Sequence, residues 1–536
     1  AVTNADGRYT IQGMRVGGPY TVTINYIGYK KETRKNINLS LGEPEVLDVD
    51  LKEDSQTLGE VTVLGRMGKG SYGASSNFSQ QQIENAPTID RNIYDIAKLS
   101  PLVNVNKNGG ISIAGTNNRY NSFQIDGMVA NDVFGLSSTG TNGGQTSANP
   151  ISMDAIEQIQ VVASPFDIRQ SGFTGGAINA ITKSGTNKLT GTAFSYYTNE
   201  NMYSHWSPYY DMTQKLTDET TQTHGFTLGG PIIKNKLFFF TSLEYRKHSY
   251  PSQFYAGAPG YFMTTATAKA MADEYEKVTG IRESYNKRNI NQEGTSVLGR
   301  LDWNINSKNT LSFRYQGNFS YDDNFGIGGS SFVFNGSGYR MKNTTHSFVA
   351  ELNSHINDNL YNELRFGATF VRDHRETGYK GPTIYVSTSP KVNMGTEYSS
   401  GVNMLNQNNW TLEDNLSIYY KNHTFTLGTH DEYYDMKNGF IQAAFGEYVY
   451  SSVDQFLNDE NPSSFVYKYS DQDLTGTRQW KTPFKAGIFG IYAQDKVDLS
   501  NRFQLTYGLR FDAPFYFNHP TWNTAFNQTE DWAGTY

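Results

Sequence analysis

From residue 189 onward, the chain is built from segments of about ten residues in which apolar and polar side chains alternate. In the segment 309–319, Leu311 and Phe313 would face one side of a strand. Ser312 and Arg314 would face the other side, because successive side chains of a strand point to opposite faces. The period of two therefore predicts strands with one apolar face and one polar face.

The connections between these segments alternate in length. We count about eleven segments, near 190–198, 222–230, 237–247, 294–305, 310–320, 344–356, 360–373, 408–419, 424–437, 485–498 and 503–515. Short connections lie at 231–236, 306–309, 357–359, 421–423 and 499–502. Long polar connections lie at 199–221, 248–293, 321–343, 374–407 and 437–484. Short turns at one rim and long loops at the other are typical of an outer-membrane β-barrel with a polar interior, and the strand length suits a tilted bilayer crossing.

The composition agrees with a barrel and argues against several other classes of protein. Only 37% of the 536 residues are hydrophobic, whereas 14% are aromatic. No run of about 18 or more apolar residues is present, so the sequence predicts no transmembrane helix. A net charge of −7 without a basic stripe argues against nucleic acid as a partner, and the lack of cysteine removes disulfides and thiolate metal sites.

The sequence contains no recognisable catalytic constellation. The motifs H-E-x-x-H, G-x-S-x-G and C-x-x-C are missing, and the nine histidines are scattered. Asp322 and Asp323 fall in a long connection, where solvated charge is the favoured interpretation and a metal site the alternative. We therefore expect no enzyme activity, no catalytic residue, no metal and no cofactor.

The stretch 73–188 has the pattern of a small α+β domain punctuated by glycines. Phe123 and Ile125 alternate as in a strand, and Asp126-Gly127 is a hairpin-type turn signal. This domain is predicted to precede the barrel strands in the chain.

Short helices are expected within and after that domain. Asp90 is placed to cap a helix over 91–99, which Pro101 ends. Ser152 is placed to cap a second helix over 153–157. A longer helix is expected in the connection 248–293, where one face carries Ala268, Met271, Ala272, Tyr275 and Val278, with Gly280 behind it.

Several short motifs make the stretch 73–188 resemble the plug domain of TonB-dependent outer-membrane transporters. The matching pieces are LVNV at 102–105, ISIAG at 111–115, IDG at 125–127, IEQIQV at 156–161 and GGAINAITK at 175–183. Within that family, the run from NDVFGL at 131–136 to FTGG at 173–176 is most similar to the Oar-like branch of the Bacteroidetes. The resemblance implies a transmembrane β-barrel filled by this plug.

About eleven strands do not close a barrel wide enough for such a plug. An open sheet edge in hydrocarbon leaves backbone donors and acceptors unpaired, at a cost of several kcal/mol each. Plugged transporters of this kind have 22 strands. We therefore expect about 11 of about 22 strands in this chain, the N-terminal half of a longer protein, with the remaining strands beyond Tyr536.

The residues 1–54 are predicted to form a small β-sandwich whose first strands are cut off. Its strands are expected around Tyr9/Ile11, Tyr20/Val22/Ile24 and Val46/Val49/Leu51. The segment resembles the carboxypeptidase-regulatory-like module that precedes many Bacteroidetes plugs, and we expect no chemistry in it. The predicted fold is thus mainly β, with a truncated sandwich (1–54), a linker (55–72), an α+β plug (73–188) and the first half of a transmembrane antiparallel barrel (189–536).

The linker contains a β-prone segment, TLGEVTVLG at 57–65, beside a run rich in Gly and Ser. Such a segment suits β-augmentation, in which a strand is offered to the sheet edge of another protein. Its position and core resemble a TonB box, formed by Glu60, Val61, Thr62 and Val63. An ordinary last strand of the sandwich is the alternative.

Two features of the plug are candidates for a role in transport. The resemblance implies that the loops 115–121 and 130–134 face outward and contact substrate, through Asn117, Arg119, Tyr120, Asn131, Asp132 and Phe134. Their mixture of polar and aromatic side chains suits a polar or peptide ligand, and packing on the barrel wall is the alternative. The resemblance also implies that Arg169 pairs with barrel carboxylates, so that the plug is released without exposing an apolar core.

These features together predict a TonB-dependent importer in the bacterial outer membrane, with the plug and N-terminal domain toward the periplasm. The expected partners are TonB with its inner-membrane energising complex, outer-membrane lipids, an unidentified extracellular substrate (peptide, glycan or chelate) and, as a candidate, a surface lipoprotein. The alternative function is Oar-like surface adhesion, or a secretion-associated barrel without an import cycle.

Overall fold

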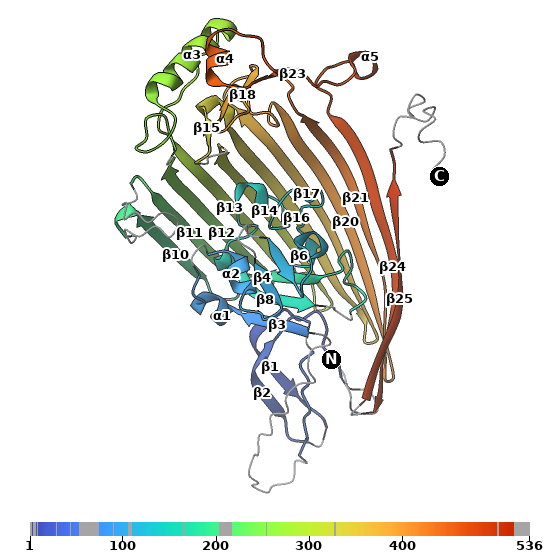
Figure 1. Cartoon of the computed structure of the whole chain (residues 1–536). Coiled ribbons are helices and arrows are strands. Elements are labelled where there is room, and N and C mark those ends of the chain that lie inside the picture. The colour runs from blue at the N-terminus through green and yellow to red at the C-terminus, as the bar shows by residue number, and fades with distance from the viewer. Residues whose placement is uncertain are drawn as a thin grey trace.

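One large curved sheet dominates the fold, and a small domain lies against its concave face (Figure 1). A strand pair at the N-terminal end and a cap of long loops complete the architecture. The computed structural model describes residues 3, 7, 9–27, 29–42, 44–52, 74–88, 91–105, 110–163, 167–202, 217–252, 254–325, 329–500 and 503–518.

The large sheet has eleven strands in chain order. They are β10 (Thr190–Asn199), β11 (Thr220–Ile233), β12 (Leu237–Pro251), β13 (Asn289–Asn304), β14 (Asn309–Asn324), β16 (Tyr339–Asn357), β17 (Leu360–Thr377), β20 (Val402–Tyr420), β21 (His423–Ile441), β24 (Thr482–Ser500) and β25 (Phe503–Tyr516). Every adjacent pair is antiparallel, so the predicted ladder is confirmed. The sheet is not closed, because β10 and β25 form its two edges.

The short connections all lie at one end of this sheet and the long ones at the other, which we call the short-turn end and the long-loop end. Apart from β10, the strands contain 14 to 19 residues, more than the sequence pattern predicts. The extra residues extend the ladder at the long-loop end, as in β16, which begins at Tyr339 rather than near 344. These extra residues are mostly polar. They therefore show no alternation of apolar and polar side chains, although their backbones pair in the ladder.

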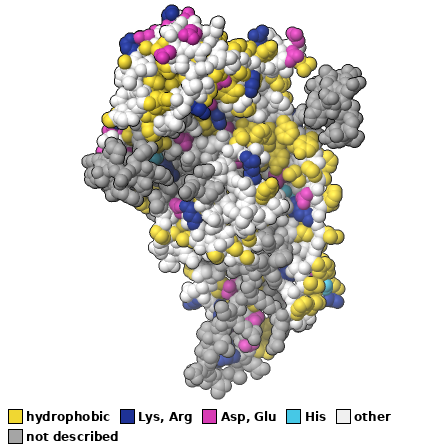
Figure 2. Space-filling view, in the orientation of Figure 1, with side chains coloured by type: hydrophobic (Ala, Val, Ile, Leu, Met, Phe, Trp, Pro, Cys, Tyr) yellow, Lys and Arg dark blue, Asp and Glu magenta, His cyan; other side chains and the backbone are white. Residues whose placement is uncertain are grey.

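The two faces of the sheet differ as the period of two predicts. On β14, Phe313 is 42% exposed on the outer face, whereas Arg314 is 3% exposed and contacts the inner domain. Leu505 and Leu509 on β25 are also exposed, and hydrophobic side chains gather over β24 and β25 at the right of the view in Figure 2. The facing predicted for β14 is therefore confirmed, and β25 shows exposed apolar side chains at the same period of two.

The inner domain, which we call the plug, is a five-stranded sheet in the order β3-β8-β9-β6-β7 with short helices around it. Its elements are β3 (Ala74–Ser79), α1 (Gln80–Asn85), α2 (Ile93–Ala97), β4 (Val103–Val105), β5 (Ile111–Ile113), η1 (Asn118–Tyr120), β6 (Ser122–Ile125), β7 (Met128–Val129), η2 (Gly144–Thr146), η3 (Met153–Ala155), β8 (Ile156–Ala163) and β9 (Gly176–Thr182). The apolar core under this sheet is built mainly from isoleucines, including Ile93, Ile96, Ile113, Ile125, Ile156 and Ile159. Among the described residues of the large sheet, Phe240 and Leu298 join that core.

Two predicted helix starts in the plug turn out differently. Helix α2 begins at Ile93, and its N-cap is Asn92, whose side chain accepts a hydrogen bond from the N–H of Asp95. Asp90 lies outside the described residues. The helix predicted over 153–157 is wrong: η3 is a single 3-10 turn, and the Ser152 hydroxyl donates to Glu244 of β12 instead of capping it.

The N-terminal module, residues 9–52, forms one antiparallel pair, β1 (Gly17–Ile24) with β2 (Glu32–Leu39). The predicted strand around Tyr20 is confirmed as part of β1. The strands predicted around Tyr9 and Val46 are wrong, because neither stretch has a ladder partner among the described residues. The hydroxyl of Tyr9 nevertheless donates to the carbonyl of Leu47, which ties the two stretches together.

The long loops combine into a cap with its own core, visible at the top of Figure 1. Its elements are α3 (Thr265–Thr279), β15 (Ser331–Val333), η5 (Asn335–Ser337), β18 (Thr383–Val386), β19 (Lys391–Met394), β22 (Glu447–Tyr450), α4 (Val453–Leu457), β23 (Ser464–Val466) and α5 (Gln472–Thr475), whereas η4 (Glu200–Met202) follows β10. The predicted helix is confirmed as α3, with Gly280 as its left-handed C-cap, although Val278 is exposed. Within the described part of the chain, none of the helices has both the length and the apolar character needed to cross a bilayer.

Candidate functional site

A buried ion cluster joins the plug to the large sheet at the turn Asp126-Gly127. Asp126 Oδ2 lies 3.0 Å from Nη1 of Arg314 on β14 and 3.3 Å from Nη1 of Arg300 on β13. Thr182, at the end of β9, donates to the same carboxylate from its N–H and its hydroxyl, each at 2.8 Å. Two cations and two neutral donors satisfy this carboxylate, so the cluster fixes the turn against β13 and β14.

The charge state of Asp126 follows from these contacts. Burial by itself would raise the pKa of the carboxyl. The guanidinium groups of Arg300 and Arg314, with the hydrogen bonds from Thr182, instead hold the pKa of Asp126 below its ordinary value. The carboxylate is therefore ionised at neutral pH, and it screens the two arginines from each other.

The local backbone explains why this turn reaches the wall. Asp126 and Gly127 have φ values of 48° and 76°, the left-handed pair that a type I′ hairpin turn requires. A Cβ on Gly127 would lie 2.5 Å from Nη1 of Arg365 on β17. Glycine therefore lets the turn approach a third barrel arginine, after Arg300 and Arg314, as closely as the backbone allows.

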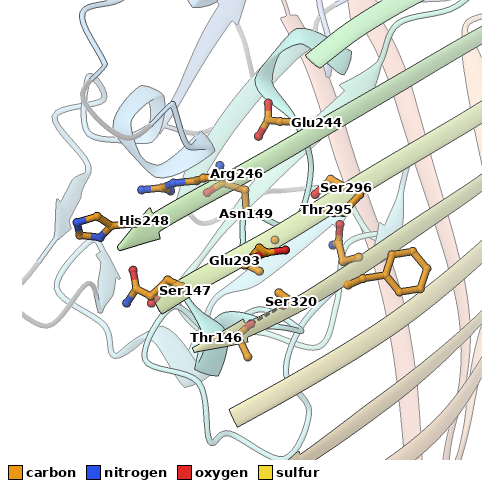
Figure 3. Close-up of a pocket in the computed structure, with 15 residues that line it drawn as sticks. Thr146, Ser147, Asn149, Glu244, Arg246, His248, Glu293, Thr295, Ser296 and Ser320 are labelled. Atoms are coloured by element: carbon orange, nitrogen blue, oxygen red, sulfur yellow. Dashed lines mark hydrogen bonds between the residues drawn. The ribbon is translucent and has the colours of Figure 1, made fainter. Parts of the chain in front are cut away.

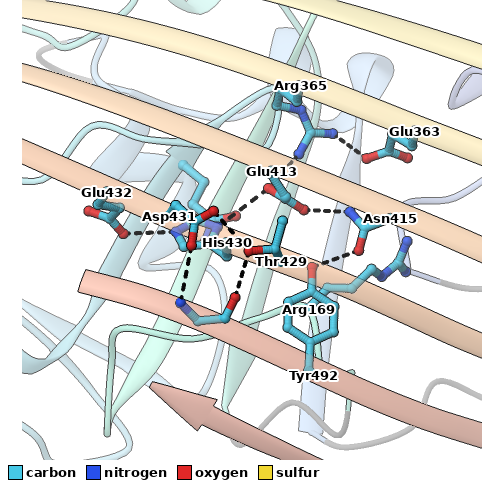
Figure 4. Close-up of polar contacts among 12 residues, drawn as sticks. Arg169, Glu363, Arg365, Glu413, Asn415, Thr429, His430, Asp431, Glu432 and Tyr492 are labelled. Carbon is cyan, nitrogen blue, oxygen red and sulfur yellow. Dashed lines mark hydrogen bonds and ion pairs between the residues drawn. The ribbon is translucent and has the colours of Figure 1, made fainter. Parts of the chain in front are cut away.

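Arg365 belongs to a second charge cluster on the inner face of the sheet (Figure 4). Its guanidinium pairs with Glu351, Glu363 and Glu413 at 2.9, 2.7 and 3.0 Å. Glu413 also lies 3.6 Å from His430, whose other ring nitrogen is 2.8 Å from Glu432. Three carboxylates around one guanidinium leave an excess of negative charge on the wall that the plug faces.

Arg169 lies beside this cluster but pairs within its own loop. Its guanidinium binds both carboxylate oxygens of Asp167, at 2.9 and 2.5 Å. The neighbouring Ile168 connects the loop to the sheet, because its N–H donates to Gln494 and its carbonyl accepts from Arg510. A direct pair between Arg169 and a barrel carboxylate stays a prediction.

A polar cleft separates the plug from the sheet closer to the long-loop end (Figure 3). It is a narrow recess that is partly open to solvent. Its charged lining comes from Glu244, Arg246 and His248 on β12 and Glu293 on β13, and its plug side comes from residues 146–149. The cleft thus offers both signs of charge with hydroxyl and amide groups between them.

One hydrogen bond crosses between the two sides of this cleft. The hydroxyls of Thr146 and Ser320 lie 2.6 Å apart and join the plug segment to β14. Further along the seam, the carbonyl of Pro150 accepts from the side chain of Asn318 at 2.9 Å and from Gln316. The plug therefore meets the wall here through these neutral hydrogen bonds and one from the Ser147 hydroxyl to the Asp322 carboxylate at 3.3 Å.

The six plug residues predicted to contact substrate fall into two groups. Asn131 and Asp132 are engaged in the plug itself: the Asn131 side chain bridges Phe123 and Asn121, and the Asp132 carboxylate accepts from the N–H groups of Phe134 and Ser137. The exposed side chains are those of Asn117, Arg119, Tyr120 and Phe134. Contact between substrate and any of the six remains a prediction.

The predicted TonB-box residues Glu60, Val61, Thr62 and Val63 lie outside the described residues. Among the residues that the structure describes, no group of three or more His, Cys, Asp or Glu is arranged to hold a metal ion.

Sequence reasoning missed the cluster at Asp126. The period of two correctly directs Arg314 inward, and the turn at Asp126-Gly127 is recognisable from its residues. What the pattern lacks is which plug turn meets which strands, since that depends on how the whole plug is oriented in the lumen. The alternation of polar and apolar residues also directs Arg300 and Arg365 inward. The arginines on the barrel side of the cluster were therefore predictable as inward-facing charges.

Comparison with family models supports each part of this architecture. An outer membrane beta barrel domain matches residues 181–292 and 262–532. A TonB-dependent receptor plug domain matches residues 69–178, and a carboxypeptidase regulatory-like domain matches residues 1–52.

Individual relatives agree with these matches. The TonB-dependent transporter Oar of Myxococcus xanthus is 26% identical over 346 residues, which cover 59% of this chain and 30% of Oar. The outer membrane transporter YddB of Escherichia coli has the same fold, with a TM-score of 0.57 at 14% identity over 82% of this chain and 56% of YddB. The ferric enterobactin receptor PfeA of Pseudomonas aeruginosa gives 0.53 at 17% identity over 82% of this chain and 58% of PfeA.

The chain therefore spans about a third of the curated relative and a little over half of the solved transporters. With its plug, its barrel strands and these matches, the chain belongs to the family of TonB-dependent receptors of the bacterial outer membrane.

Proposed function

We propose that this chain is part of an importer that carries a polar substrate across the outer membrane with energy delivered by TonB. The observation that carries the proposal is the way the plug is held: Asp126 is clamped by Arg300 and Arg314 of the sheet. A buried ion cluster is costly to leave half-paired, but its groups are well solvated once water enters. A plug held in this way is able to shift without exposing a large apolar surface to water.

The cleft beside residues 146–149 supports a polar substrate. Its lining offers carboxylates, a guanidinium, an imidazole and hydroxyls, a set that suits a ligand with both donors and acceptors, such as a peptide or a glycan. The exposed Arg119, Tyr120 and Phe134 are proposed to make the first contact with such a ligand. The substrate then follows the seam between the plug and β12–β14.

The coupling step is assigned to Glu60–Val63, which we propose pairs with TonB as an added strand. In this mode the backbone supplies most of the pairing, so loss of strand geometry matters more than loss of one side chain. The domain boundaries 1–54, 55–72, 73–188 and 189–536 belong to the same proposal, with the N-terminal module and the short-turn end facing the periplasm.

A cysteine trap tests the coupling without knowledge of the substrate. The chain contains no cysteine, so Thr62→Cys introduces a single thiol. In cells that carry a TonB with one cysteine in its pairing strand, we expect a disulfide-linked complex. Adding Val61→Pro should abolish the complex, because proline removes a ladder donor and fixes φ. Adding Glu60→Ala, which changes one side chain and keeps the backbone, should leave most of it.

The alternative, a barrel for adhesion or secretion without an import cycle, is favoured by one observation. The long loops form a cap with a continuous core rather than separate loops. A trap that gives no TonB complex in the Thr62→Cys protein would favour this alternative over import.

A further inference from the structure

The N-terminal module is attached to the plug through a pair of glutamines. Gln158 and Gln160 lie on one face of β8 and are 6% and 3% exposed. The Gln158 side-chain oxygen accepts a hydrogen bond from the N–H of Leu41, and the Gln160 side-chain amide donates one to the Leu41 carbonyl, both at 2.8 Å. The two glutamines thus hold both backbone polar groups of one residue, as a neighbouring strand would.

The plug face around these two glutamines carries further amide groups. Asn179 of β9, which lies opposite Gln160 in the ladder, donates to the Gln160 side-chain oxygen at 3.2 Å. Ile159 and Val161, which alternate with the glutamines along β8, are fully buried in the apolar core on the opposite face. Apolar surface is costly to expose to water, whereas amides exchange a protein partner for water at small net cost. This amide face of the plug can therefore be exposed to water repeatedly at little cost in free energy.

A second attachment joins the module to both the plug and the barrel. Arg15 donates to the carbonyl of Thr182 on β9 at 3.3 Å and lies 3.4 Å from Asp302 on β13. Asp302 is itself paired with Arg300 at 3.0 Å. Arg15 thereby extends the cluster around Asp126 into the N-terminal module, and it ties the end of β9 to the barrel wall.

The length of the covalent connection does not by itself fix the module's place. Residues 53–73 join it to β3, and a fully extended chain of that length would span about 70 Å. Among the described residues, the docking contacts given above are hydrogen bonds and the ion pair between Arg15 and Asp302.

We propose that the N-terminal module is a reversible strap, which docks on the amide face of the plug and, through Arg15, ties the plug to β13. While it is docked, the strap opposes displacement of β9 from the wall. When it undocks, the plug and the barrel stay folded. The strap acts in the intact chain at rest, without substrate and without TonB.

Hydrogen exchange on the purified intact protein in detergent tests the strap. The amide of Leu41 reports docking, because it donates to Gln158, and the amides of β8 and β9 report the plug. After correction for intrinsic rates, we expect the Leu41 amide to exchange at least about tenfold faster than the β8–β9 amides, since local opening needs less energy than plug opening.

Two variants and a matched control complete the test. Arg15→Ala and Gln158→Ala should each speed exchange at Leu41 by about tenfold, the effect of losing roughly one good hydrogen bond, with β8–β9 unchanged. Arg34→Ala should leave Leu41 as in the wild type, because Arg34 pairs with Glu32 inside the module. If the Leu41 amide exchanges as slowly as the β8–β9 amides, the N-terminal module is an integral part of the plug. That result would overturn the proposal that the module docks reversibly. If Arg15→Ala leaves the exchange rate of the Leu41 amide unchanged, Arg15 does not help to hold the strap on the plug.

Discussion

At the level of single residues, the contact between plug and barrel depends on one carboxylate, that of Asp126, which lies between two arginines. Asp126 stands between Arg300 and Arg314, and all three side chains are at most 13% exposed. In such surroundings, removing the Asp126 carboxylate leaves Arg314 without its partner beside Arg300, which keeps only Asp302. The position of the plug turn is therefore sensitive to a change of a single atom.

Asp126→Asn is the corresponding prediction. It should weaken the docking of the turn by about 3 kcal/mol, because the amide cannot neutralise two buried guanidinium groups. The amide of Thr182, which donates to Asp126, should then exchange faster. Asp154→Asn is the control, because Asp154 pairs with Arg91 within the plug. Equal exchange at Thr182 in both variants would contradict the clamp.

The same carboxyl predicts a pH dependence. Its pKa is lower in the folded protein than the ordinary value, so its stabilising effect is complete above that ordinary value, near 3.9. The effect is lost as the pH falls through the lowered folded pKa. The stability difference between the wild type and Asp126→Asn should therefore stay constant from neutral pH down to about 5. A difference that shrinks between pH 7 and 5, measured by thermal unfolding, would be inconsistent with a lowered pKa.

Gly127→Ala separates backbone strain from close approach. A Cβ here is strained by φ of 76° and meets Arg365, whereas Gly115 has φ of 85° and open space around it. Alanine at either site should cost about 1–2 kcal/mol for its left-handed backbone. Gly127→Ala should cost more than Gly115→Ala in thermal unfolding, because the guanidinium must move. Equal losses of thermal stability in the two variants would mean that the Arg365 side chain moves aside at no cost.

At the scale of elements, each strand follows a period of two that the membrane and the lumen impose together. Strand existence, order and facing were predictable, because residues such as Phe313 and Arg314 belong to opposite faces at every step of the ladder. Strand ends were not, because the long-loop halves pair through polar residues without a pattern. The strands of the N-terminal module were overpredicted around Tyr9 and Val46, since alternation alone does not supply a partner.

Phe313→Arg tests the outward face of β14. An arginine there should destabilise the folded barrel in lipid by up to about 4 kcal/mol, the cost of a cation near the bilayer midplane. Phe313→Leu should cost much less, because it stays apolar. Urea titration of the protein folded in phospholipid vesicles measures both. A small loss with arginine would place this position near the headgroups or away from lipid.

At the scale of the whole molecule, the candidate site was less predictable than the fold. Asn131 and Asp132 are polar loop residues like Asn117, yet their side chains hold the plug together. Their roles depend on which backbone groups come near them in three dimensions. The cap could not be predicted either. The sequence predicts helix α3, but the burial of α3 depends on strands that come from loops much later in the chain.

Glu283→Ala tests the cap as one body. The Glu283 carboxylate accepts hydrogen bonds from the N–H groups of Gly336 and Gly395, on two other loops. Its removal leaves buried donors unsatisfied, at about 1–3 kcal/mol each. We expect faster proteolysis of the cap with the barrel intact. Asp273→Ala, which removes an exposed pair with Lys269 on α3, should leave the cap as resistant as in the wild type.

The ladder and the cap differ in when they are able to form. Each strand of the large sheet pairs only with its sequence neighbours, so a hairpin is complete as soon as its second strand is in place. The cap core instead brings Met263 together with Phe456, and contacts between such distant residues form slowly. The cap is therefore finished only after β21 has been laid down, because Phe456 follows that strand in the chain.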